Sequence, residues 1–219
     1  MRRSIVRALI FVLASMLVLP GMAAPAQGQT RDEAARALSD ASPQVRREAV
    51  GRLGDVGTMV DVPLLVKSLR DADAQVRELA ERSIWEIWAR SGNAEVDALY
   101  RTGIEQMAAG DLQQGIATFT RIIRQKPDFA EGWNKRATLY FLAGDLRKSL
   151  ADCDEVVKRN PYHFGALSGY ALIYAQLEQY SRALDYSRRA LEVNPNMDAV
   201  RRNMELIERV LEQRRKEMI

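Results

Sequence analysis

The side chains that most often carry out catalysis or bind transition metals are scarce in this sequence. Its 219 residues include one histidine, His163, and one cysteine, Cys153. A zinc site built from His and Cys needs three or four such ligands, and a nucleophilic cysteine needs a neighbouring base. The sequence also lacks a glycine-rich phosphate loop and a nucleophile elbow. We therefore predict no catalytic residue, no metal site and no cofactor.

Three acidic residues flank the cysteine: Asp152, Asp154 and Glu155. Neighbouring residues on a helix point in different directions, so these carboxylates are not expected to converge on a metal ion. We interpret them as a solvated helix face. His163 follows Pro161-Tyr162 in a predicted loop, and we interpret it as a structural or solvated side chain.

Residues 1–26 have the pattern of an export signal. Arginines precede an uninterrupted apolar run from Ala8 to Leu19, and Ala24-Pro25-Ala26 matches the A-x-A cleavage pattern. The run is shorter than the roughly 20 residues that span a bilayer. We predict a signal peptide cleaved after Ala26, a periplasmic or secreted mature chain, and no stable membrane insertion after cleavage. The alternative is a segment that is kept as an anchor.

The basic charge belongs to this leader. The whole chain has a formal charge of +3, and residues 1–26 hold three of the 32 basic residues and none of the 29 acidic ones. The predicted mature chain is therefore neutral. Binding to nucleic acid needs a concentrated positive field, so no nucleic-acid partner is predicted.

Residues 27–93 contain an internal period of 31 residues, in which Leu38, Asp40, Val45, Arg46 and Ala49 recur as Leu69, Asp71, Val76, Arg77 and Ala80. Ser42-Pro43, Asp61 and Asp73 are N-terminal caps of predicted helices, and Leu53-Gly54 is expected to close one. The pattern Leu-x-Asp-x-x-x-x-Val-Arg-x-x-Ala resembles short HEAT-like repeats. The resemblance implies two helix pairs, with Arg46 and Arg77 each paired to a neighbouring Asp.

Residues 94–197 contain a second period, because Pro127, Pro161 and Pro195 are spaced by 34 residues. Gly110-Asp111-Leu112 recurs as Gly144-Asp145-Leu146. The spacing resembles the tetratricopeptide repeat, a helix-turn-helix unit. In the middle repeat the template positions are held by Trp133, Ala137, Tyr140, Ser149, Cys153 and Pro161. Cys153 stands where that template has a buried aromatic residue, so we interpret it as a small core residue.

The ends of such an array must be covered, because each helix pair leaves an apolar face exposed. Residues 198–219 are predicted to form a capping helix, whose apolar stripe is Val200, Met204, Ile207 and Leu211. We expect the HEAT-like pairs to seal the first tetratricopeptide repeat, with Trp85 and Trp88 buried at that junction. The predicted fold is an all-α solenoid: two HEAT-like pairs, three tetratricopeptide pairs and a capping helix.

A binding surface follows from the resemblance to tetratricopeptide proteins, whose first helices line a concave groove that holds a peptide. The 34-residue period aligns side chains at i, i+4 and i+7 of each predicted first helix. These positions form three rows: Tyr100, Asn134 and Ser168; Ile104, Thr138 and Leu172; Met107, Phe141 and Ala175. One subfamily clamps peptide carboxylates with Lys, Arg and Asn in these rows. Only Asn134 fits that set, so an acidic tail is not expected.

Residues 131–137 and 163–169 are similar to a group of exported bacterial tetratricopeptide proteins. The resemblance supports the class of protein and its export, and leaves the ligand undefined. Because the repeat signal is strong and no reactive groups converge, we predict a non-enzymatic interaction scaffold in the cell envelope, with a protein or peptide partner in the groove. One alternative is an accessory or chromophore-lyase-like enzyme that uses the HEAT-like repeats. Another is a structural spacer that self-associates, so oligomerisation remains possible. A further alternative is that some groove residues pack against the chain's own termini.

Overall fold

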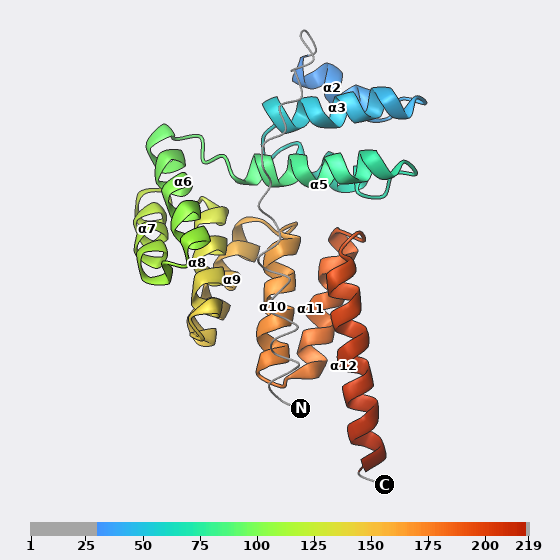
Figure 1. The fold of residues 1–219 in the computed structure, drawn as a ribbon. Coiled ribbons are helices and arrows are strands. Elements are labelled where there is room, and N and C mark those ends of the chain that lie inside the picture. The colour runs from blue at the N-terminus through green and yellow to red at the C-terminus, as the bar shows by residue number, and fades with distance from the viewer. Residues whose placement is uncertain (1–29, 218–219) are drawn as a thin grey trace.

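The computed structural model describes residues 30–217, so the predicted signal peptide and its cleavage site lie outside the described residues. The described residues form eleven helices and no strand (Figure 1). The first group is α2 (Arg31–Ala37), α3 (Pro43–Val56), α4 (Val62–Ser68) and α5 (Ala74–Trp88). The second is α6 (Ala94–Ala109), α7 (Leu112–Gln125), α8 (Ala130–Leu142), α9 (Leu146–Arg159), α10 (Phe164–Gln176), α11 (Tyr180–Val193) and α12 (Asp198–Glu217). The predicted all-α solenoid is confirmed.

The first group, α2 to α5, forms two helix pairs that we call the HEAT unit. Asp73 caps α5, because its carboxylate accepts the Val76 N–H at 3.0 Å. Arg46 joins the two pairs, donating from Nε and Nη2 to the two oxygens of Asp71, at 2.7 Å each. The expected pairing is therefore confirmed for Arg46. It is wrong for Arg77, which donates to the backbone carbonyls of Asp71 and Ala72, at 2.8 and 3.1 Å.

Gly54 does not close a helix, contrary to the expectation, since α3 continues to Val56. A Cβ atom at this position would lie 2.6 Å from Oγ of Ser83 on α5. That hydroxyl donates to the Val50 carbonyl of α3 at 3.0 Å. The glycine is needed because α3 and α5 approach closely at this point.

The second group forms three pairs, α6/α7, α8/α9 and α10/α11, which we call the TPR array. Small residues sit where the two helices of a pair cross, as the repeat pattern predicted. A Cβ atom on Gly103 would lie 2.6 Å from Cζ of Phe119, and Ala137 and Ala171 are buried at the equivalent positions. These positions allow the close packing of each pair.

Helix α12 covers the last pair. Its stripe packs as predicted, with Val200 and Ile207 buried and Met204 and Leu211 partly buried against α10 and α11. The outer face of α12 carries exposed charged residues, among them Arg201, Glu205 and Glu208. The array therefore ends in a polar surface, which a terminal repeat needs for solubility.

The HEAT unit does not seal the first tetratricopeptide repeat; it docks on the third. Figure 1 shows α5 lying across the ends of α10 and α11. The Trp88 ring lies 4.2 Å from the ring of His163 and 4.9 Å from that of Phe164. At the other side of the junction, Asn196 Nδ2 donates to the Leu69 carbonyl at 2.8 Å. The expectation for this junction was wrong in its location, although Trp88 is buried as predicted.

The surfaces of the two parts explain the docking site. The outer face of α6 is polar or small, with exposed Ala98, Arg101, Thr102 and Glu105, and gains little from being covered. By contrast, the corresponding surface of the HEAT unit is apolar. Leu69 follows the end of α4, and Trp85 and Trp88 lie in the last turn of α5. Phe164, Val193 and Met197 of the third repeat complete that core. Among the described helices, none has the length and apolar composition required to cross a bilayer.

Candidate functional site

The nine predicted groove residues lie on the first helices of the three pairs, α6, α8 and α10. Seven of them are partly exposed, as a binding surface requires. The other two, Asn134 and Leu172, are only 7% and 8% exposed. Leu172 is therefore part of the groove wall, and a charge placed there would be buried.

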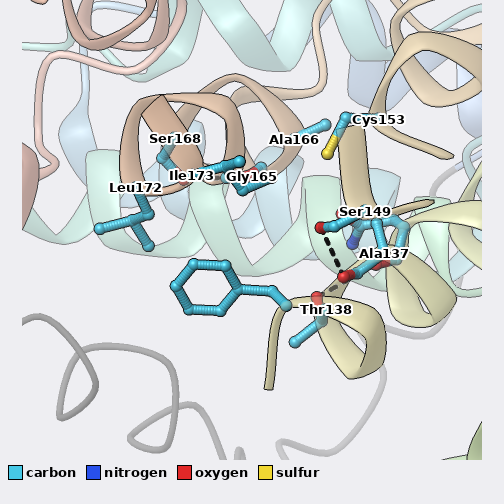
Figure 2. A pocket seen from close by; sticks show the side chains of 12 residues that line it. Ala137, Thr138, Ser149, Cys153, Gly165, Ala166, Ser168, Leu172 and Ile173 are labelled. Atoms are coloured by element: carbon cyan, nitrogen blue, oxygen red, sulfur yellow. Dashed lines mark hydrogen bonds between the residues drawn. The ribbon is translucent and has the colours of Figure 1, made fainter. Parts of the chain in front are cut away.

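The structure brings five of the nine residues together around one small pocket of about 40 Å³ between α8 and α10 (Figure 2). We call it the α8–α10 slot. The five are Asn134, Thr138, Phe141, Ser168 and Leu172. Tyr100, Ile104 and Met107 pack instead against the core of the first pair, and Ala175 packs against the cluster under α12.

The slot exists because α10 has small residues where it faces α8. Gly165, Ala166, Ser168 and Gly169 line it from α10. A Cβ atom on Gly169 would have Cys153 Sγ as its nearest neighbour, at 3.7 Å, so the space beside this glycine is open. The other glycine of this face, Gly165, is closed off by Trp85, since a Cβ atom there would lie 2.6 Å from Cη2 of that ring. The contribution of Ser149 and Cys153 from α9 was not predicted.

The hydroxyl groups of the slot are already hydrogen-bonded within the protein. Ser149 Oγ donates to the Ala137 carbonyl at 2.7 Å, as Figure 2 shows. Ser168 Oγ donates to the Gly165 carbonyl at 2.9 Å, and Thr138 Oγ1 donates to the Asn134 carbonyl at 3.0 Å. A hydroxyl has a single proton to donate. None of these three groups has a donor left for a ligand.

Asn134 takes part in a buried polar cluster at the N-terminal end of α8. Its Nδ2 donates to both carboxylate oxygens of Glu131, at 3.1 Å each. Lys135 Nζ lies 2.9 Å from Oε1 of Glu131, and His163 Nε2 lies 2.8 Å from Oε2. Glu131 is 2% exposed. Burial alone would raise the pKa of this carboxyl, but Lys135 and His163 outweigh burial and hold the pKa well below its usual range.

His163 is fully buried, so its structural role is confirmed and the solvated alternative is wrong. It is the N-cap of α10, where Nδ1 accepts the Ala166 N–H at 3.0 Å. Since Nδ1 accepts, the hydrogen-bond pattern places the ring proton on Nε2, which donates to Glu131. The sequence reading missed Glu131 and Lys135, although their i, i+4 spacing on one helix face was visible.

Cys153 is 2% exposed, and burial raises the pKa of its thiol, so the neutral form persists. The acidic residues around it have separate partners. Asp152 pairs with Arg136 at 2.7 Å, Glu155 pairs with Arg159, and Asp154 accepts from the hydroxyl of Tyr170. Within residues 30–217, no three His, Cys, Asp or Glu side chains converge as metal ligands would.

The fold and the groove define an α-solenoid that combines two kinds of helical repeat. The family model of HEAT repeats matches residues 2–85. The model of the tetratricopeptide repeat matches residues 100–164 and 143–198. Both matches agree with the two helix-pair architectures described above.

Individual proteins are similar to about half of this chain. A TPR repeat-containing protein of Rhizobium etli is 35% identical over 108 residues, which is 49% of this chain. The chain spans 53% of the length of that relative. The TPR domain of Sgt2 from Aspergillus fumigatus has a TM-score of 0.54 at 23% identity, over 57% of this chain and 83% of that domain. The first TPR domain of Spaghetti, bound to an HSP90 peptide, has a TM-score of 0.52 at 22% identity, over 53% of this chain and 92% of that domain.

Proposed function

We propose that this protein is a non-enzymatic scaffold that binds an extended segment of a partner protein in the groove of α6, α8 and α10. One observation carries the proposal: Thr138, Phe141 and Ser168, which are partly exposed, line a slot between α8 and α10. Ile104, Met107 and Phe141 supply the apolar surface. Rigid helices hold these side chains in place, so binding orders few protein groups and costs little entropy.

The peptide bound by the Spaghetti domain supports this mode of recognition. That domain is similar in fold to about half of this chain, and its ligand is a peptide. We propose the same kind of ligand, a peptide, for the TPR array of this protein. The chemistry of that peptide is derived from the residues of this chain.

We further propose that the mature protein works in the cell envelope, periplasmic or secreted, after export directed by residues 1–26. The arginines, the apolar run and the A-x-A motif support this location. Fractionation followed by N-terminal sequencing tests it, with a mature chain beginning at Gln27 as the expected result. A cytoplasmic pool that retains Met1 would contradict export.

Site-specific photo-crosslinking in cells tests the groove. A photoreactive amino acid at Thr138, which lines the slot and is partly exposed, should give a discrete adduct with a partner chain. The matched control is Ala151, exposed on the outer face of α9, which should give none. Equal adducts from both positions would refute binding in the groove.

A further inference from the structure

The α8–α10 slot limits the chemistry of the partner. We propose that the groove binds an uncharged, apolar segment of another protein, which inserts one short aliphatic side chain, of alanine to valine size, into the slot. This inference rests on the proposed function and adds the class of ligand to it. Three observations carry it: the size of the slot, its hydrogen bonds, and the pairing of the charged groups that Asn134, a slot residue, contacts.

The slot is too small for a large side chain. Its volume is about 40 Å³, whereas an engineered apolar cavity that accepts benzene measures about 150 Å³. This volume favours a small aliphatic group over an aromatic ring. The apolar part of the α10 lining includes Ala166, Gly169 and Ile173, which offer dispersion contacts to an aliphatic group.

The slot offers no hydroxyl donor for an anion. Ser149, Ser168 and Thr138 each donate to a backbone carbonyl of the protein. The remaining S–H of Cys153 is a weak donor. A carboxylate in this position would lose its hydration and gain no comparable hydrogen bond, which is unfavourable.

Glu131 accepts hydrogen bonds from the donor groups that would otherwise attract an acidic ligand. Both of its oxygens accept from Asn134 Nδ2. The Lys135 ammonium, the His163 ring and the Tyr100 hydroxyl also contact this carboxylate. The cluster is also closed to a basic ligand, because Glu131 is buried and already paired. This internal carboxylate therefore selects for a segment without charge at this end of the groove.

The test compares the binding of three fluorescent peptides to the full chain by anisotropy. The peptides share uncharged flanks of equal length and differ at one central residue, which is Val, Asp or Trp. We expect the Val peptide to bind at least tenfold more tightly than the other two. Equal or tighter binding of the Asp peptide would overturn the proposal, and so would binding of none of the three.

Gly169→Ala fills the slot without disturbing the fold, because the added Cβ lies 3.7 Å from Cys153 Sγ, an ordinary contact. We expect it to weaken binding of the Val peptide at least fivefold. The control is Gly51→Ala, on α3 in the HEAT unit, where an added Cβ meets nothing within 4 Å. An unchanged affinity in Gly169→Ala would overturn the assignment of the slot.

Glu131→Gln tests the role of the internal carboxylate, because it removes the negative charge that pairs with Lys135 and leaves one acceptor oxygen in place of two. The preference for Val over Asp should fall at least tenfold, and an unchanged preference would contradict this role. Folding is checked by circular dichroism, and Gly169→Ala keeps the proposal testable if Glu131→Gln does not fold. The wild type could bind the Val, Asp and Trp peptides equally well while Thr138→Arg binds none of them. In that case the inference about the slot fails, and the proposed binding in the groove stands. If neither peptides nor crosslinks are found, the proposed function itself fails.

The chain's own apolar run, Ala8 to Leu19, has the same chemistry as the proposed ligand. We assign the groove to another protein because this run lies in the segment predicted to be removed. Mass spectrometry of the Thr138 crosslinks separates the two sources. Adducts to a foreign apolar segment are expected, and adducts confined to residues 8–19 would overturn the assignment.

Discussion

The indole of Trp88 stacks on the imidazole of His163, with ring centroids 4.2 Å apart and ring planes inclined by 15°. This contact joins the HEAT unit to the loop before α10. His163 in turn hydrogen-bonds Glu131 on α8, so one buried set of side chains connects α5, α8 and α10. The two kinds of repeat therefore share a core instead of standing as separate modules.

Trp88→Ala should destabilise the whole protein. Trp88 is 3% exposed, and truncating a buried tryptophan costs about 3–5 kcal/mol. Urea denaturation followed by circular dichroism measures the effect, with Met59→Ala as the control, since Met59 is 46% exposed. The control should stay within about 0.5 kcal/mol of wild type. If both variants lost a similarly small free energy of unfolding, the junction would contribute little to the stability of the protein.

The stability of the protein should fall at acid pH through Glu131. Its pKa is lowered in the folded state relative to the ordinary value of 4.5, so the unfolded state binds the proton more readily. The contribution of this group is therefore fully present above about pH 4.5 and is lost as pH falls further. Urea midpoints measured between pH 7 and pH 3 should fall more steeply for wild type than for a Glu131→Gln/Lys135→Met double variant. Parallel profiles would exclude Glu131 as a source of this dependence.

Two glycines of α3 should respond in opposite ways to the same substitution. Gly54→Ala places a methyl group 2.6 Å from Ser83 Oγ, and overpacking of this kind costs about 1–3 kcal/mol. Gly51→Ala meets nothing within 4 Å, and the higher helix propensity of alanine should stabilise by about 0.5–1 kcal/mol. Thermal unfolding of both variants checks this. Equal effects would mean that α3 and α5 do not approach closely at Gly54.

The helix pairs could be predicted from the sequence because their signals are local. Proline spacing, N-caps such as Asp73 and small residues such as Gly103 each act within one repeat. The docking of the HEAT unit could not be predicted in the same way. It depends on which surface of the array is apolar at the helix ends, where Phe164, Val193 and Met197 come together only in the folded chain.

The groove was predictable in outline and not in its chemistry. The repeat period placed Thr138 and Phe141 on one face, and both line the slot. It also predicted that Asn134 faces a ligand, whereas the amide is occupied by Glu131. The helical spacing of Glu131 and Asn134 hinted at this bond. Another residue bound to Glu131, His163, comes from the loop before α10, which a single-helix pattern does not reveal.

The affinity of an uncharged, valine-containing peptide for two arginine variants tests the central claim most directly. Thr138→Arg places a charged side chain at the slot, and Ala151→Arg places the same side chain on the exposed outer face of α9. Binding in the groove predicts at least a tenfold loss of affinity for Thr138→Arg and a change of less than twofold for Ala151→Arg. Equal affinities for the two variants would contradict the account.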